Sequence, residues 1–239
     1  LTLSSLSRVL ISRGDLEGAE ATAREALGMN LRLHGEGTAP VADALNELAI
    51  AVNERRRSED AIALMREALA IHRRVLPPGS GTIGTDLSNL AAYLTFAGAY
   101  AEAESLLSEA IPIMVANYGE RHPRVWFDQT NYGRLLQSKT DYAGAAEVFR
   151  KVLAGRLEVL GERHEMVPVS KNDLALVLRA QGRFAESEKL QAETIAHFDT
   201  VAGPSHPLTL AARASRGRVL CDLGRFSEAE AELRPRREA

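Results

Sequence analysis

The chain repeats itself every 42 residues, and this period limits the fold more strongly than any other feature of the sequence. One column of the repeat holds only small residues, and its members are Ala19, Ala61, Ala103, Ala145, Ser187 and Ala229. A turn residue stands at a fixed distance before each of them: Gly14, Arg56, Gly98, Thr140, Gly182 and Gly224. A period of roughly 20 to 50 residues indicates a stack of similar supersecondary units.

Apolar residues within one copy recur at the spacing of an α-helix. In the second copy, Leu45, Leu48 and Val52 lie three or four residues apart and share one helical face. This pattern predicts a first helix from about Pro40 to Arg55 and a second from about Glu59 to Leu76. We call them the A helix and the B helix of a copy. A tight turn between them makes the pair antiparallel.

Small residues also occupy one column of the predicted A helices: Ser7, Ala49, Ala91, Gly133, Ala175 and Gly217. They allow the backbones of the A and B helices to approach closely. One such pair cannot bury both of its faces, so neighbouring pairs must stack. We therefore predict an all-α fold, a right-handed α-solenoid of about six stacked antiparallel helix pairs. The predicted repeats of this single domain are 1–37, 38–79, 80–121, 122–163, 164–205 and a truncated 206–239.

The repeat resembles the tetratricopeptide repeat (TPR), which pairs small-residue columns with a Gly-x-aromatic turn and an Ala-Glu start of the second helix. The 42-residue variant is most similar to the repeats of kinesin light chain. Leu-Asn-x-Leu-Ala at residues 45–49 and Tyr-Gly-Glu-Arg-His-Pro at residues 118–123 carry this likeness. It covers nearly the whole chain. The resemblance implies a scaffold for protein–protein interaction.

Composition narrows the function classes. The net charge of -3 gives no basic field of the kind that follows a phosphate backbone, so we expect no nucleic-acid partner. No apolar run approaches the roughly 20 residues that span a bilayer, so we expect no membrane partner and a cytoplasmic location. Cys221 has no second cysteine to pair with. Because the chain starts at Leu1 inside a predicted helix, we interpret it as part of a longer protein.

Three histidines fall in one column of the repeat, at positions 122, 164 and 206. Equivalent atoms of stacked helices lie about 8 to 10 Å apart, whereas ligands of one zinc ion lie about 2 Å from the metal. We therefore predict no metal site. Thr38 and Ser80 occupy the same column, and Pro follows two of the histidines, so the column predicts helix N-termini.

No catalytic motif is present in the sequence. Cys221 has no histidine within one helical turn that could act as its base. The sequence contains no Gly-rich phosphate loop, C-x-x-C or H-E-x-x-H motif. Acidic pairs recur at the starts of B helices, where they favour the helix N-terminus. We predict a non-catalytic chain with no cofactor.

Amide side chains recur on the face of the A helices that adjoins the buried columns. An asparagine offers both a donor and an acceptor, so a series of them can pair with the backbone of an extended peptide. In the family that the chain resembles, asparagines at matching positions hold a peptide backbone. The corresponding candidates are Asn46, Asn89, Asn131 and Asn172.

Further candidates on the same face would set the preference for a peptide. Arg134, Arg179 and Arg218 would favour an acidic segment or a C-terminal carboxylate, and Gln137 adds an amide. Phe96 and Phe127 are candidates for the pocket of an apolar anchor. The alternative is that these side chains form an ordinary solvated face.

We therefore expect a protein–protein interaction module that binds an extended, acidic peptide in a concave groove lined by A helices. The alternative is a structural spacer or regulatory region that self-associates end to end, because both terminal copies would expose faces that further repeats cover. A third class, an enzyme, would need residues outside this chain.

Overall fold

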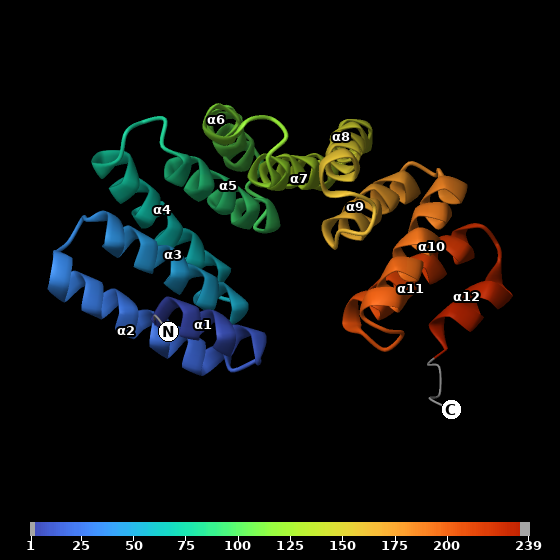
Figure 1. Ribbon diagram of the computed structural model, residues 1–239, viewed down its shortest axis with the longest axis horizontal. Coiled ribbons are helices and arrows are strands. Elements are labelled where there is room, and N and C mark those ends of the chain that lie inside the picture. Colours follow the sequence, from blue (N-terminus) through green and yellow to red (C-terminus); the bar gives the residue numbers. More distant parts are fainter. Residues whose placement is uncertain (1–2, 235–239) are drawn as a thin grey trace. The chain divides into compact units, whose positions relative to one another are not determined.

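The computed structural model describes residues 3–234, and these residues form helices joined by short turns (Figure 1). No strand occurs in this part of the chain. The helices in order are α1 (Leu3–Ser12), α2 (Leu16–His34), α3 (Ala39–Glu54), α4 (Ser58–Val75), α5 (Gly81–Phe96), α6 (Tyr100–Tyr118), α7 (Pro123–Ser138), α8 (Tyr142–Leu160), α9 (Met166–Ala180), α10 (Phe184–Val201), α11 (Pro207–Asp222) and α12 (Phe226–Leu233).

The prediction of an all-α solenoid of helix pairs is confirmed. Odd-numbered helices are the predicted A helices and even-numbered helices the B helices. The predicted helices of the second copy, from about Pro40 to Arg55 and from about Glu59 to Leu76, appear as α3 and α4 with ends that differ by one residue. The helices described in residues 3–234 include none long and apolar enough to cross a membrane.

The small-residue column of the B helices lies in the interior of every pair. The exposed fractions are 0 % at Ala19, Ala61, Ala103, Ala145 and Ser187, and 2 % at Ala229. The small column of the A helices faces it. At Gly133 a Cβ atom would lie 2.5 Å from Cε1 of Phe149, a fully buried ring of α8. A side chain at Gly133 would therefore push the two helices apart.

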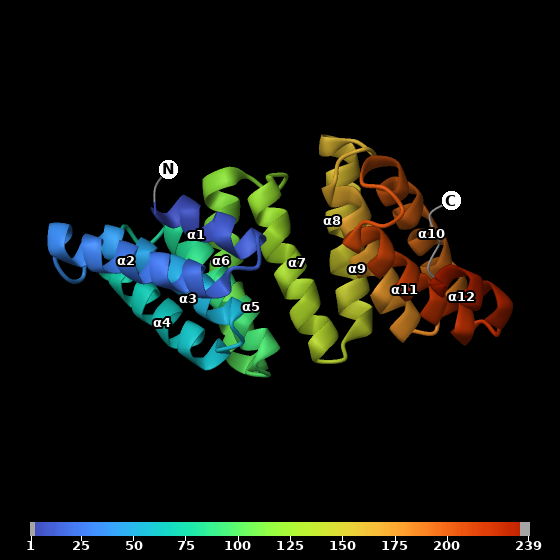
Figure 2. The ribbon, with the colours of Figure 1, turned by 90° about the horizontal axis from the view of Figure 1, so that it is seen from below.

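The chain divides into two compact units, residues 1–131 and 132–239, and α7 runs across the division. In the first unit, Val41 and Leu45 of α3 pack against Ala68 and Ile71 of α4. In the second unit, the core of α7, α8 and α9 centres on Phe149. Figure 2 shows the helices of each unit from a second side.

The histidine column marks helix N-termini, as predicted. Nδ1 of His122 accepts a hydrogen bond from the backbone N–H of Arg124, at 3.2 Å. Nδ1 of His164 accepts one from Met166 at 3.2 Å, and His206 accepts one in the same way at the start of α11. The imidazoles thus satisfy backbone donors that a helix start leaves unpaired.

Charged residues replace leucine in one A-helix column of the second unit, and the structure shows how they are neutralised. Nζ of Lys171 lies 2.7 Å from a carboxylate oxygen of Glu193. Arg213 is only 6 % exposed and lies 2.8 Å from Asp199. Lys171 and Arg213 thus both form ion pairs with the B helix α10 of their own unit.

The turns between A and B helices require a left-handed backbone conformation. Four of the six turn positions hold glycine, for which this conformation carries no steric cost. Arg56 and Thr140 occupy the other two, with φ angles of 60° and 63°. A side chain in this region costs about 1 to 2 kcal/mol.

Replacing either residue by glycine should therefore stabilise the chain. For Arg56→Gly and Thr140→Gly we expect the free energy of unfolding to rise by about 0.5 to 1 kcal/mol each, after the entropy of glycine in the unfolded chain is subtracted. Urea denaturation followed by circular dichroism measures the change. The reverse substitution, Gly98→Ala at φ 81°, should lower stability. Stabilisation by Gly98→Ala would contradict the assignment of strain.

Candidate binding surface on the A helices

Within each unit, neighbouring A helices contact one another, and we call the surface that carries their candidate asparagines and arginines the A-helix wall. In the first unit, Arg8 of α1 pairs with Glu47 of α3, and Nδ2 of Asn46 donates to Oδ1 of Asp86 in α5 at 2.7 Å. In the second unit, Nε of Arg179 in α9 pairs with Asp222 of α11 at 2.5 Å. Hydrogen bonds and ion pairs between neighbouring A helices therefore already engage several polar side chains of this wall.

The four candidate asparagines differ in how far these contacts occupy them. Nδ2 of Asn46 donates to Asp86, and its carbonyl oxygen has no hydrogen-bond partner among the described residues, while Oδ1 of Asn172 accepts from Gln191 at 3.1 Å. Asn131 is only 5 % exposed, and its Nδ2 donates to Oγ of Ser88 at 3.3 Å. Asn89 is half-buried and has no side-chain hydrogen bond within residues 3–234. Of the four asparagines, Asn89 is therefore the one whose amide has neither atom engaged within the described residues.

The reason lies in the residue opposite Asn89. A side chain of one A helix meets the residue 39 positions later on the next, as in Arg8 with Glu47 and Arg134 with Asp173. For Asn89 the corresponding residue is Ile50, which has no polar group to offer. The amide of Asn89 is therefore left to solvent or to a ligand.

The three candidate arginines are also unequal. Arg134 lies 3.2 Å from a carboxylate oxygen of Asp173, and Arg179 is paired with Asp222. Arg218 donates to the backbone oxygen of Ala214 and to Ser215, and it has no carboxylate partner among the described residues. The positive charge expected along the second unit is thus partly neutralised by the protein itself.

The two candidate phenylalanines are both exposed, Phe96 at 83 % and Phe127 at 47 %. Phe96 ends α5, whereas Phe127 stands in the first turns of α7. The repeat position of Phe127 falls at Thr85 in α5, eleven residues before Phe96. Eleven helical residues span about 16 Å, so the repeat spacing places the two rings at different levels along their helices. Gln137 is half-buried, and its side chain makes no hydrogen bond within residues 3–234.

Behind the wall, two B helices contact the next A helix through a buried hydrogen bond that the sequence did not predict. Nδ1 of His72 in α4 lies 2.6 Å from Oδ2 of Asp86 in α5, and the two residues are 1 % and 4 % exposed. In the second unit, Arg156 of α8 donates to Oγ of Ser170 in α9 at 2.6 Å. These buried hydrogen bonds link consecutive pairs.

The next copy along the chain also has a carboxylate at the position of Asp86, but the preceding B helix offers it no histidine. Asp128 of α7 is 1 % exposed, and its repeat equivalent is Asp86. The position that holds His72 in α4 holds Met114 in α6, which is also buried. Oδ2 of Asp128 has no hydrogen-bond partner within the described residues. Comparing the columns 72, 114 and 156 with 86, 128 and 170 in the sequence would have revealed this mismatch.

Burial raises the pKa of Asp128 to about 6, although a hydrogen bond from Ser88 and the charge of Arg124 act in the opposite direction. Burial also raises the pKa of Asp86 and of Asp173, and neighbouring His72 and Arg134 oppose these shifts. In each case the cause is the cost of placing a charged carboxylate away from water.

The pKa of Asp128 predicts a pH-dependent loss of stability. The folded chain holds this proton up to a pH of about 6, whereas the unfolded chain releases it near 4, so ionisation between these values opposes folding. We expect Asp128→Asn to be more stable than the parent by about 2 to 3 kcal/mol at pH 7.5 and nearly equal at pH 4. Urea denaturation at both pH values measures the difference. A constant difference, or none at pH 7.5, would show that Asp128 is not an isolated buried acid.

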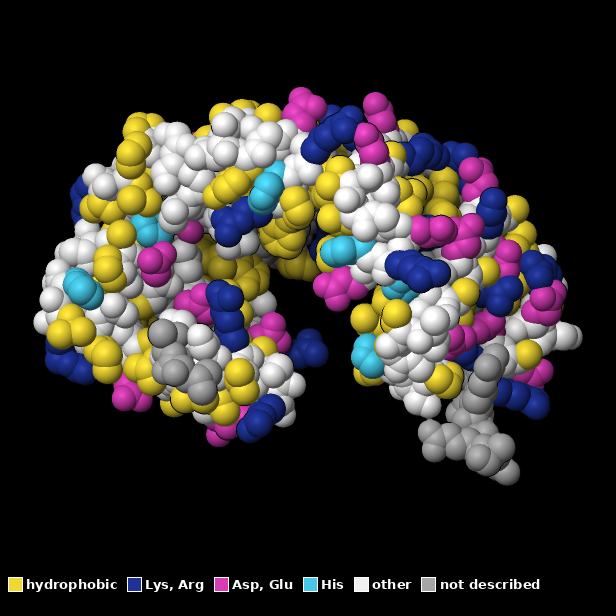
Figure 3. Space-filling view, viewed as in Figure 1, with side chains coloured by type: hydrophobic (Ala, Val, Ile, Leu, Met, Phe, Trp, Pro, Cys, Tyr) yellow, Lys and Arg dark blue, Asp and Glu magenta, His cyan; other side chains and the backbone are white. Residues whose placement is uncertain are grey.

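Figure 3 shows basic and acidic side chains next to one another over the part of the molecule that contains α9 to α12, in agreement with the ion pairs of that unit. Such a mixed surface has no single sign of charge that would select a partner at long range. Recognition therefore has to rely on individual side chains at short range.

Comparison with solved structures gives the same fold. BtubC (BKLC) from P. vanneervenii has a TM-score of 0.74 at 20 % identity, over 94 % of this chain and 96 % of that one. The putative kinesin light chain repeats of Podosopora anserina have a TM-score of 0.70 at 20 % identity, over 83 % of this chain and 93 % of that one. NprR in complex with its cognate peptide NprX has a TM-score of 0.68 at 12 % identity, over 96 % of this chain and 64 % of that one.

The family comparison rests on sequence profiles. Among curated proteins, none matches the chain significantly. One tetratricopeptide repeat profile matches residues 84–158 and 167–234, and a second matches residues 1–38 and 41–80. Together with the small-residue columns and paired helices, these matches show that the chain belongs to the tetratricopeptide repeat family.

Proposed function

We propose that the chain is a protein–protein interaction module that binds an extended peptide segment along the A-helix wall. One observation carries this proposal: Asn89 presents a half-buried amide without a partner among the described residues. At the same repeat position, Glu47 and Asp173 each form an ion pair with the neighbouring A helix. An amide in this state can donate to and accept from a peptide backbone at once.

The surroundings of Asn89 suit an extended chain better than a compact ligand. Ile50 and Ala92 lie at neighbouring wall positions and are partly exposed, so they offer apolar contact on both sides of the amide. Asn46 adds a carbonyl oxygen that its hydrogen bond to Asp86 leaves open. NprR, a structure of the same fold, holds its cognate peptide, which supports a peptide as the class of ligand.

One hydrogen bond cannot hold a peptide by itself. A net hydrogen bond contributes about 0.5 to 1.5 kcal/mol, whereas micromolar affinity needs about 8 kcal/mol. Apolar contacts must therefore supply much of the binding energy, and the backbone contacts set orientation. Phe96, with 83 % exposure on the same helix as Asn89, is the large apolar side chain best placed to contribute.

The proposal predicts unequal effects of the two asparagines on binding. Peptides selected from a random phage-displayed library on the immobilised chain provide the probe. We expect Asn89→Ala to weaken the selected peptides about three- to tenfold in calorimetric titrations, because it removes hydrogen bonds worth about 1 kcal/mol. Asn131→Ala should have a smaller effect on affinity, because its amide is buried against Ser88.

Asn30→Ala is the matched control, since this asparagine lies on the B helix α2 and donates to the backbone of Ala26. If Asn89→Ala changes affinity no more than Asn30→Ala does, the wall around Asn89 is not the binding surface. Failure to select any peptide would contradict peptide binding itself.

A preference for acidic peptides would depend mainly on Arg218, the wall arginine without a carboxylate partner among the described residues. For a peptide that binds the second unit, we expect Arg218→Gln to reduce the advantage of a Glu-containing sequence over its Gln analogue about threefold at low salt. Arg134→Gln should reduce it less, because Asp173 already neutralises that guanidinium. An equal or larger effect of Arg134→Gln would place the acidic preference elsewhere.

A further inference from the structure

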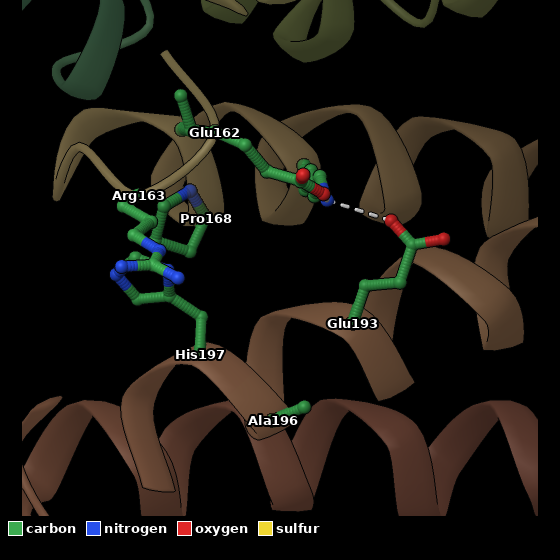
Figure 4. Close-up of a pocket in the computed structure, with 8 residues that line it drawn as sticks. Glu162, Arg163, Pro168, Glu193, Ala196 and His197 are labelled. Atoms are coloured by element: carbon green, nitrogen blue, oxygen red, sulfur yellow. Dashed lines mark hydrogen bonds and ion pairs between the residues drawn. The ribbon is translucent and has the colours of Figure 1, made fainter. Parts of the chain in front are cut away.

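The second unit contains a cavity away from the A-helix wall. It has a volume of about 330 Å³, near the lower end of the range for small-molecule sites. It opens between the loop that precedes α9, the start of α9 and the last turns of α10 (Figure 4). The lining residues are Glu162, Arg163, Val167, Pro168, Lys171, Glu193, Ala196 and His197.

At one end of the cavity, the cation there, Lys171, is already paired with carboxylates. The ammonium group of Lys171 lies 2.7 Å from Glu193 and 4.0 Å from Glu162, and its side chain is only 12 % exposed. Two carboxylates thus surround one cation. This end carries a net negative charge, so it has no capacity to take up a further anion.

The other end holds two nitrogen-bearing side chains without such partners. Figure 4 shows the side chains of Arg163 and His197 close together beside Pro168, across the cavity from Glu193. Within residues 3–234, neither the guanidinium of Arg163 nor the imidazole of His197 has a hydrogen bond or an ion pair. Other arginines of this unit, such as Arg179, Arg213 and Arg216, are paired with carboxylates.

The floor between the two ends is apolar. Val167 is 1 % exposed and Pro168 is also buried, while Ala196 contributes a methyl group from α10. A ligand that fits therefore has an oxyanion for Arg163 and His197 next to a short apolar portion.

The charged side chains of the cavity favour a carboxylate over a phosphate group. A guanidinium binds a carboxylate through two parallel hydrogen bonds, and an imidazole N–H adds a third donor. A phosphate dianion would feel twice the repulsion from Glu162 and Glu193 that a carboxylate feels. We propose that this cavity binds a carboxylate attached to a short apolar group, held by Arg163 and His197 over Val167 and Pro168.

Two sources could supply this chemistry, a small carboxylic acid or the C-terminal residue of a protein chain. The site is independent of the proposed peptide surface, because it lies between α9 and α10 and is lined by none of the candidate wall residues. Loss of binding at Asn89 would leave this proposal unaffected.

The test uses matched pairs of ligands in heteronuclear NMR titrations of the full chain. N-acetyl-leucine should shift the ring signals of His197 and the backbone amide of Arg163, whereas N-acetyl-leucine amide, which has the same shape without the charge, should not. N-acetyl-Ala-Ala-Ala-Leu with a free carboxylate separates the sources. Clearly tighter binding of this peptide identifies a chain terminus, and equal binding identifies a small acid.

Substitutions then assign the donors. We expect Arg163→Gln to weaken N-acetyl-leucine binding about tenfold or more, because it removes a charge-assisted hydrogen-bond pair. His197→Gln should weaken it less, and the control Lys189→Gln, which removes an exposed charge of α10 outside the cavity, should leave it unchanged. Thermal melts of the variants should match the parent, since neither Arg163 nor His197 has an internal polar partner.

Three results would overturn the proposal. The first is that the NMR signals of His197 and Arg163 do not shift with N-acetyl-leucine at up to about 10 mM. This concentration is tenfold above a dissociation constant of about 1 mM, the weakest affinity that would support the proposal. The second is equal binding of the amide analogue, which would make the contact purely apolar. The third is inorganic phosphate that binds as tightly as the carboxylate with the same dependence on Arg163, which would assign the site to phosphate.

Discussion

Close contact between the A and B helices is the constraint on which the rest of this structure depends. Six small residues, from Ala19 to Ala229, are almost completely buried at the same place in each pair. Gly133 shows how little space remains, because the ring of Phe149 occupies the volume that its Cβ would need. With the two helices fixed at this distance, each residue of a 42-residue copy has a defined neighbour. A change at one repeat position therefore has a predictable contact to affect.

Contacts between consecutive pairs are less uniform than contacts within them. The position behind the wall holds a His72–Asp86 hydrogen bond in one place and an Arg156–Ser170 bond in another. In the copy between these two, Met114 takes the repeat position of His72, and Asp128 keeps an unpaired oxygen within the described residues. Van der Waals packing of other side chains must hold consecutive pairs together where this polar contact is missing. The buried hydrogen bonds thus distinguish the pairs from one another without defining the fold.

The sequence predicted the helices and their pairing closely, because both follow from local spacing. The ends of α3 and α4 came within one residue of the prediction, and the histidine column was correctly placed at helix N-termini. The polar partners could not be obtained in this way. Asn131 and Ser88 are 43 residues apart in the chain, so whether the amide of Asn131 contacts Ser88 or a ligand depends on the distance between α5 and α7. The ion pair of Arg134 with Asp173 depends in the same way on how one A helix lies on the next.

An unpaired polar group has opposite consequences in the interior and at the surface. Inside, the unpaired oxygen of Asp128 is shielded from solvent, so its ionisation lowers stability. At the surface, the unpaired amide of Asn89 and guanidinium of Arg163 can bind water in the free chain at little cost. A ligand needs only to displace that water, whereas at Arg134 or Asn131 it must also replace an internal contact. The positions where the repeat leaves a surface group without an internal partner are therefore the ones where a partner can bind most favourably.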